Sequence, residues 1–231
     1  MKKNKNHIGI DISKLSFDVA IKNENDKYLH FKFSNDSKGF TEFINLLDQN
    51  FSICVMEASG PYYLKLATYL FNKKVSVCVI NPLVIRRFSQ MRMSRTKTDK
   101  KDAVIIAEYG KTEKPNLWEP EADYVLEIKQ MQAFVEQMNK SRTGFIRQRE
   151  AFKHNTVEAF VLNESLEKMI NLIEPEIALI EDKMIAIIHH HHNQLFKQLQ
   201  SIPGIGRKTA MLLIVISGGF TKFENARQLS S

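Results

Sequence analysis

The chain has 231 residues, of which 43% are hydrophobic and 26% charged, as is ordinary for a soluble globular protein. Its formal net charge of +7 favours an anionic partner, of which nucleic acid is the commonest. The apolar run at residues 210–216 is far too short to span a bilayer, and the basic opening lacks the apolar stretch of a signal peptide. We therefore expect a cytoplasmic protein with no membrane partner.

The first third of the chain alternates strand and helix patterns. The predicted elements, in chain order, are strands at residues 7–12, 17–21 and 28–33, a helix at 40–47, a strand at 51–56, a helix at 61–71 and a strand at 75–80. Three strands followed by strand–helix–strand indicate an α/β domain with a mixed sheet and flanking helices. We expect this domain to span residues 1–120, with the element order of a ribonuclease-H-like fold.

Long helical periodicity begins at about residue 123. Apolar residues recur in alternating steps of four and three, the pattern of a coiled-coil seam. They are Leu166, Ile170, Ile173, Ile177, Ile180, Met184 and Ile187, and a weaker seam runs through Val125, Ile128, Val135, Met138, Phe145 and Phe152. We expect a coiled-coil segment over residues 121–193, formed either by an intramolecular helix pair or by an arm that dimerises. Pro175 should kink the second helix or begin a new one.

Two carboxylates stand at predicted strand ends. Asp11 ends the first strand and Glu57 ends the fourth. Burying a carboxylate there is costly unless it is paired or bound to a metal ion. If strands one and four are neighbours in the sheet, the two side chains converge at one edge. Glu57 alone also suits a strand end at the surface.

A second pair of carboxylates, Asp99 and Asp102, lies at the predicted start of a helix that runs to Glu108. Their spacing of three places both on one helical face. Taken alone, they are also typical of helix N-termini, where the dipole favours acidic residues. Together with Asp11 and Glu57 they form a set of oxygen donors that suits two hard cations and phosphodiester chemistry. The Gly-Ile-Asp opening also occurs in actin-like ATPases and sugar kinases, but that group needs a second glycine-rich phosphate loop, and only Gly60 follows strand four.

Basic residues accompany the carboxylates and recur near the end of the chain. Those around the acidic set are Arg86, Arg87, Arg92, Arg95, Lys97, Lys100 and Lys101, and they suit a phosphate backbone entering a metal site. Residues 201–210, with Gly204, Gly206, Arg207 and Lys208, separate two short predicted helices. This pattern is typical of a helix-hairpin-helix, which binds the DNA backbone without reading sequence. An ordinary helix–turn–helix corner is the alternative.

Four segments together resemble the DEDD insertion-sequence transposases, a family that includes relatives of the pilin-gene-inversion recombinase. They are residues 9–11, 56–60, 95–103 and 202–206, in the family's order along the whole chain. The resemblance implies a RuvC-like domain in which Asp11, Glu57, Asp99 and Asp102 bind Mg²⁺ and are catalytic. It further implies a coiled-coil insertion and, from residue 194 to 231, the start of a C-terminal transposase domain with the hairpin.

The same resemblance implies partners and a reaction. Members act on DNA as oligomers, here expected as a dimer or tetramer, and use a non-coding guide RNA from their own element. They also carry a nucleophilic serine downstream of the hairpin, whose surroundings Ser230 and Ser231 do not match. We therefore expect a chain cut off before that segment. The function expected is DNA strand cleavage and exchange, and the alternative is a catalytically incomplete nucleic-acid-binding fragment.

Overall fold

The computed structural model describes residues 6–92, 99–157 and 159–220, with the side chains of Asp99 and Lys100 left out. The chain divides into two compact units, Met1–Pro120 and Glu121–Ser231, which are treated separately below. Among the described helices, none combines the length and apolar character that a membrane span requires.

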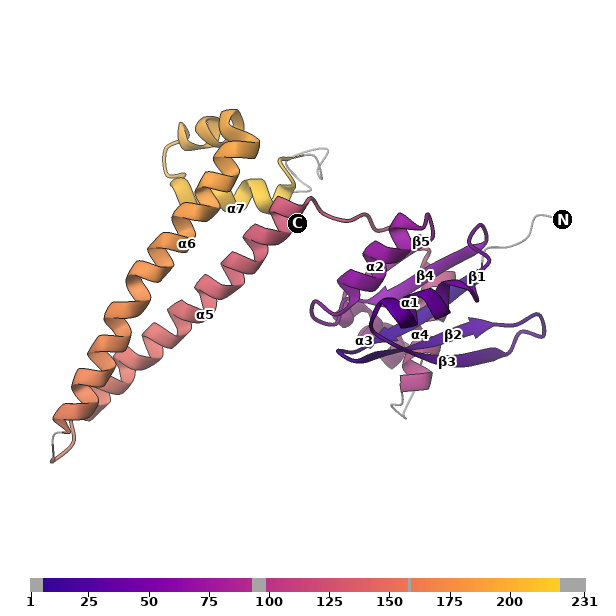
Figure 1. The fold of residues 1–231 in the computed structure, drawn as a ribbon, viewed down its shortest axis with the longest axis horizontal. Coiled ribbons are helices and arrows are strands. Elements are labelled where there is room, and N and C mark those ends of the chain that lie inside the picture. Colours follow the sequence, from indigo (N-terminus) through magenta and orange to yellow (C-terminus); the bar gives the residue numbers. More distant parts are fainter. Residues whose placement is uncertain (1–5, 93–98, 158, 221–231) are drawn as a thin grey trace. The chain divides into compact units, whose positions relative to one another are not determined.

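The first unit is built on a five-stranded mixed sheet in the order β3-β2-β1-β4-β5 (Figure 1). Its strands are β1 (Asn6–Ile12), β2 (Ser16–Lys22), β3 (Tyr28–Ser34), β4 (Ser52–Glu57) and β5 (Ser76–Ile80). β1 and β2, and β2 and β3, are antiparallel, whereas β1 and β4, and β4 and β5, are parallel. The expected mixed sheet with strands one and four as neighbours is confirmed, and it fits a ribonuclease-H-like α/β fold.

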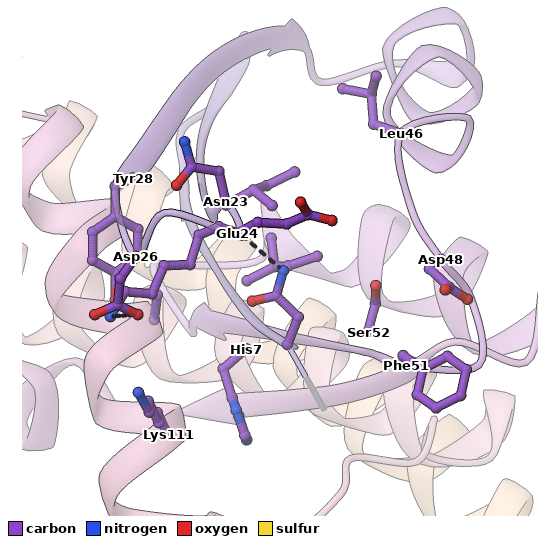
Figure 2. A pocket seen from close by; sticks show the side chains of 15 residues that line it. His7, Asn23, Glu24, Asp26, Tyr28, Leu46, Asp48, Phe51, Ser52 and Lys111 are labelled. Atoms are coloured by element: carbon purple, nitrogen blue, oxygen red, sulfur yellow. Dashed lines mark hydrogen bonds and ion pairs between the residues drawn. The ribbon is translucent and has the colours of Figure 1, made fainter. Parts of the chain in front are cut away.

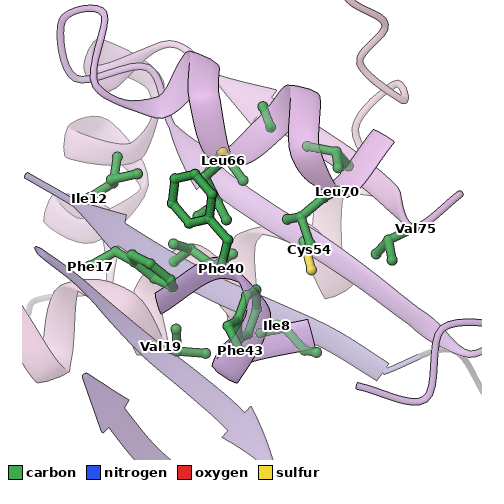
Figure 3. Close-up of a cluster of buried hydrophobic side chains, with 14 of the residues drawn as sticks. Ile8, Ile12, Phe17, Val19, Phe40, Phe43, Cys54, Leu66, Leu70 and Val75 are labelled. Atoms are coloured by element: carbon green, nitrogen blue, oxygen red, sulfur yellow. The ribbon is translucent and has the colours of Figure 1, made fainter. Parts of the chain in front are cut away.

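One face of this sheet is covered by α1 (Ser37–Ile44) and α2 (Tyr63–Asn72). Alternate residues of β1, such as Ile8 and Ile10, point into this layer because side chains alternate along a strand. Phe17 lies in this layer with Phe40 and Phe43 (Figure 3). Its ring centroid is 5.4 Å from that of Phe33 and 5.5 Å from that of Phe43. The period-2 pattern of the sequence therefore reflects a real two-sided sheet.

The opposite face is covered by α3 (Pro82–Met91) and α4 (Asp99–Glu113). The described part of α4 runs from Asp99 past Glu108, the predicted end of this helix, to Glu113. The helix α3 was missing from the sequence prediction. Its signal was Asn81, whose side chain accepts a hydrogen bond from the Leu83 amide at 2.9 Å, followed by proline at the first helical position.

Both cysteines are buried and free, one on each side of the sheet. Burial raises the pKa of Cys78 to about 11 and raises the pKa of Cys54 further. Both thiols are therefore protonated at neutral pH and act as small apolar core residues.

The second unit consists of α5 (Asp123–Phe152), α6 (Phe160–Gln200) and α7 (Arg207–Ser217). α5 and α6 pack along each other as an intramolecular pair (Figure 1). The residues that α6 buries include Leu166, Ile170, Ile173, Ile177 and Met184, which the predicted seam contains.

Of the two outcomes expected at Pro175, the start of a new helix does not occur. α6 continues through this residue, and its backbone leaves the helical region at His192 instead (φ −140°, ψ 36°). Pro175 and Asn171 are both exposed, so water can bond the Asn171 carbonyl that lacks an amide partner. The His192 ring takes part in a tertiary contact, with its Nε2 atom 2.7 Å from the Tyr124 hydroxyl of α5.

Candidate metal and nucleic-acid site

Asp11 and Glu57 lie next to each other at the carboxyl edge of the sheet. The parallel pairing of β1 and β4 places Ile10 opposite Met56, and the two carboxylate residues follow directly. Neighbouring strands are about 4.8 Å apart in a sheet. The sequence prediction that strands one and four bring these residues to one edge is consistent with this register.

The two carboxylates also share a face of the sheet. Ile10 and Met56 belong to the core under α1 and α2, so the residues that follow them point to the other side. Val55, two residues before Glu57, packs in the core that α3 and α4 cover. Asp11 and Glu57 are therefore directed to the α4 side, and both are partly exposed.

Two glycines set the direction and closeness of α4. A Cβ added to Gly9 would lie 1.9 Å from the Ala103 carbonyl oxygen and 2.5 Å from the Ala107 amide nitrogen. A Cβ added to Gly110 would lie 3.4 Å from the His7 ring. The helix backbone thus rests on β1 and runs antiparallel to it. Its first turn lies toward the carboxyl end of β1.

This geometry places the start of α4 alongside Asp11. Asp11 lies two residues after Gly9, which is about 7 Å further along β1. Asp99 lies four residues before Ala103, which is about 6 Å back along α4. Because α4 runs antiparallel to β1, both displacements are in the same direction. Asp102 is partly exposed, and the side chain of Asp99 lies outside the described part of the chain. Within the described side chains, no group of three or more His, Cys, Asp or Glu is close enough to hold a metal ion.

A further carboxylate, Asp18, lies at this site and was absent from the sequence prediction. It stands directly opposite Asp11 in the β1–β2 pairing, and the Lys32 ammonium lies 3.2 Å from its carboxylate. Like charges that face each other across strands are destabilising, so cations are favoured at this position. Alternation in the second strand was its only sequence signal.

Glu57 is held by a neighbouring hydroxyl. Ser59 donates a hydrogen bond from its side chain to Glu57 Oε1 at 2.7 Å. This bond fixes one carboxylate oxygen and leaves the second oxygen to other ligands.

The predicted basic residues around the carboxylates are described only in part. Arg95 and Lys97 lie outside the described residues, as do the side chains of Lys100 and Asp99, whereas Lys101 is exposed on α4. Arg86 and Arg87 are exposed on α3. Arg92 differs because its guanidinium lies 3.8 Å from the Glu108 carboxylate and covers the Phe88 ring.

The predicted hairpin connects α6 to α7. Gly204 has φ +88°, a left-handed conformation that glycine adopts without strain. Gly206 caps α7 without a side-chain hydrogen bond, and an added Cβ at either glycine would meet no atom within 4 Å. The surface over the first turn of α7 is therefore open to a ligand.

The two basic residues of this hairpin are engaged by α6. Arg207 Nη2 lies 3.6 Å from Asp182 Oδ1, and Lys208 Nζ lies 2.6 Å from Glu181 Oε2. A nucleic-acid backbone that binds these cations must compete with two carboxylates of the same unit.

Neutralising both acids, as Glu181→Gln with Asp182→Asn, is expected to raise the affinity of the chain for DNA. Surface ion pairs contribute about 0.2–1 kcal/mol each, which corresponds to roughly a two- to thirtyfold gain for the two pairs together. Fluorescence anisotropy with labelled duplex DNA measures the change, and Glu167→Gln, an exposed acid elsewhere on α6, is the matched control. Unchanged affinity would show that the hairpin does not contact the DNA.

A separate cavity of about 500 Å³ opens at the amino edge of the sheet (Figure 2). Its lining includes His7, Tyr28, Asp48 and Lys111. Burial, with a smaller effect of Glu108, raises the pKa of Tyr28. Because β1 enters at this edge and ends at Asp11, the cavity lies away from the carboxylates.

Comparisons with known proteins agree with this geometry. The family model of the IS110-type DEDD transposases, described as "Transposase", matches residues 8–152. The pilin gene-inverting proteins of Moraxella lacunata and Moraxella bovis are each 30% identical to the chain over 242 residues, which cover 98% of this chain and 70% of each relative. The matched region contains the sheet apart from its first two residues, the α4 helix and all four predicted carboxylates. The chain belongs to the IS110-type DEDD transposase family.

Proposed function

We propose that the chain is a DNA transposase or site-specific recombinase that cleaves and exchanges DNA strands. Its catalytic site consists of Asp11, Glu57, Asp99 and Asp102. The observation that carries the proposal is that Asp11 and Glu57 share one face and one edge of the sheet, with the first turn of α4 directed toward them. The similarity to proteins named for gene inversion supports DNA as the substrate.

The residues present fit a divalent cation. All four side chains are hard oxygen donors, the type that Mg²⁺ prefers, and Asp18 adds negative charge beside Asp11. When bound, Mg²⁺ supplies charge stabilisation for the oxygens of a phosphodiester under attack. Helical spacing places positions 99 and 102 on the same face of α4 as Ala103, which packs against the sheet. This spacing supports a shared role for Asp99 and Asp102 in one site.

The other residues orient the ligands and hold the substrate. Ser59 orients the Glu57 carboxylate through its hydrogen bond. Arg95, Lys97, Lys100 and Lys101 suit phosphate contacts beside the site, and Gly204, Gly206, Arg207 and Lys208 suit backbone contacts at the hairpin. In this proposal residues 1–120 form the catalytic domain, 121–193 a coiled-coil arm, and 194–231 the start of the transposase domain.

The proposal also includes assembly of the chain into homo-oligomers and binding of a guide RNA. A second apolar row on α6 is left exposed by α5 and repeats with heptad spacing. It consists of Leu162, Met169, Leu172 and Leu179. Such a row suits the same row of a second copy in a dimer or tetramer. The basic surfaces serve RNA and DNA backbones equally well, because both present phosphates.

Magnesium calorimetry on the intact chain tests the metal site. We expect the wild type to bind Mg²⁺, and Asp11→Ala and Asp102→Ala to lose about tenfold or more in affinity while remaining folded. Glu24→Ala, which removes an exposed acid in the turn at the amino edge, is the control and should bind as the wild type does.

A cleavage assay separates this function from binding alone. Mg²⁺-dependent nicking of DNA that is lost in Asp11→Ala supports the recombinase. If the wild type binds DNA or RNA but neither Mg²⁺ binding nor cleavage is detected with nucleic acid present, the chain is a nucleic-acid-binding module without strand chemistry.

A further inference from the structure

The described pairing of β1 with β4 ends just before the two carboxylate residues. Ile10 opposite Met56 is the last described rung between β1 and β4. Beyond it, Asp11 pairs with β2 on one side and Glu57 pairs with β5 on the other. No further rung of the described β1–β4 pairing fixes the separation between the two carboxylate residues. A connection between the loops that follow the two strands would add a restraint on these strand ends.

Three loops meet at this edge because β1, β3 and β4 run in the same direction. They are residues 13–15 after β1, residues 35–36 after β3 and residues 58–62 after β4. The first loop continues from Asp11, and the third continues from Glu57. A link between these loops therefore restrains both carboxylates.

Asn35, in the loop after β3, supplies such a link. Its side-chain Nδ2 donates to the Ser13 carbonyl oxygen at 2.9 Å and to the Tyr62 carbonyl oxygen at 3.2 Å. Its backbone amide donates to the Leu15 carbonyl oxygen at 2.9 Å. One residue thus joins the loop after Asp11 to the loop after Glu57.

The chemistry of this link requires an amide. Both partners of the side chain are carbonyl oxygens, and a primary amide offers two donors without a charge. The opposite amide orientation would set Oδ1 against two carbonyls, so the acceptors fix the assignment. The Asn35 Oδ1 atom is enclosed and makes no hydrogen bond within the described residues. The side-chain hydrogen bonds of Asn35 described here are therefore donated by Nδ2. An aspartate of the same shape would place an acceptor against acceptors.

We propose that Asn35 is a positioning residue for the carboxylate site: its amide bridges the loops that follow β1 and β4 and restrains the separation of Asp11 and Glu57. The inference rests on the proposed metal-dependent function, because it concerns the geometry of that site. The inference adds Asn35 to the residues that shape the site, although the loop after β3 contains none of the four proposed metal ligands.

Two substitutions test it on the full chain. Asn35→Ala removes both donors, and the isosteric Asn35→Asp replaces them with acceptors. Each is expected to weaken Mg²⁺ binding about tenfold, as supporting residues of metal sites commonly do. Asn23→Ala is the matched control, because Asn23 accepts a turn hydrogen bond from the Lys27 amide at the opposite edge of the sheet. It should leave Mg²⁺ affinity unchanged.

Hydrogen exchange without metal gives an independent measurement. Peptides that cover residues 11–16 and 57–63 should exchange faster in both Asn35 variants, while β5 exchanges as in the wild type. Equal thermal midpoints for the Asn35 and Asn23 variants would separate positioning from general stability.

The outcomes are distinct. If the wild type binds Mg²⁺ and the Asn35 variants bind it equally well, the inference is wrong while the metal site stands. If exchange at both loops is also unchanged, Asn35 is not a bridge at all. If the wild type binds no Mg²⁺, the proposed function and the positioning role both fall.

Discussion

Replacing Gly9 by alanine is expected to displace α4 and to weaken Mg²⁺ binding without removing a carboxylate. The new Cβ would lie 1.9 Å from the Ala103 carbonyl oxygen, which is backbone and cannot rotate away. Overpacking of this kind costs about 1–3 kcal/mol, and α4 must shift along its contact with β1. Because α4 carries Asp102, the shift separates it from Asp11. We expect Mg²⁺ affinity to fall about tenfold or more.

The measurement combines Mg²⁺ calorimetry with urea unfolding. Unfolding of the first unit can be followed by fluorescence of the single tryptophan, Trp118, which packs against its core and lies edge-on to Phe71. Gly144→Ala is the matched control: it is a helical glycine whose added Cβ would meet no atom within 4 Å, and alanine there should stabilise α5 by about 0.5–1 kcal/mol. A Gly9→Ala chain of wild-type stability and Mg²⁺ affinity would refute the close packing of α4 on β1.

Replacing Phe196 by alanine is expected to unfold the hairpin region of the second unit. Phe196 is fully buried in the core that α6 shares with α7, and its ring lies edge-on to His189. Removing a buried phenylalanine costs about 3–5 kcal/mol. The first turn of α7 would lose its support, so affinity for DNA should fall, whereas Mg²⁺ binding by the first unit should remain.

Two signals distinguish the units in this experiment. In the Phe196→Ala variant, the helical circular dichroism signal at 222 nm should be lost at a lower temperature than in the wild type. The thermal transition seen by Trp118 fluorescence, which reports on the first unit, should stay at the wild-type temperature. Phe134→Ala, on the exposed side of α5, is the control and should change stability little. Loss of both signals together would mean that the two units fold as one.

The sequence predicted those parts of the fold that rest on local periodicity. Alternation of apolar residues located the second and third strands, and short apolar runs located the other three. All five strands contribute apolar side chains to the core under α1 and α2. Acidic residues typical of a helix start predicted a helix from Asp99, and the described part of α4 includes this residue. The family-specific segments also identified the family, because they combine these elements in one order along the chain.

Features that depend on tertiary contacts could not be predicted from the sequence. Asp18 became part of the site through the pairing register, and Asn35 through three loops from distant parts of the chain. The break in α6 was assigned to Pro175 from a local rule, whereas the contact with Tyr124 is associated with a break at His192. The convergence of all four carboxylates on a metal ion stays a prediction.

The ion pairs of Arg207 and Lys208 with α6 have a consequence for how binding responds to salt. Cations that neutralise phosphates release condensed counterions, so affinity normally falls steeply as ionic strength rises. When DNA displaces Asp182 and Glu181, these carboxylates take up cations from solution and offset part of that release. The logarithm of affinity should then vary less steeply with the logarithm of salt concentration than the number of basic contacts implies. Asp182 and Glu181 of α6 would thus make the affinity of the hairpin for DNA less sensitive to salt concentration.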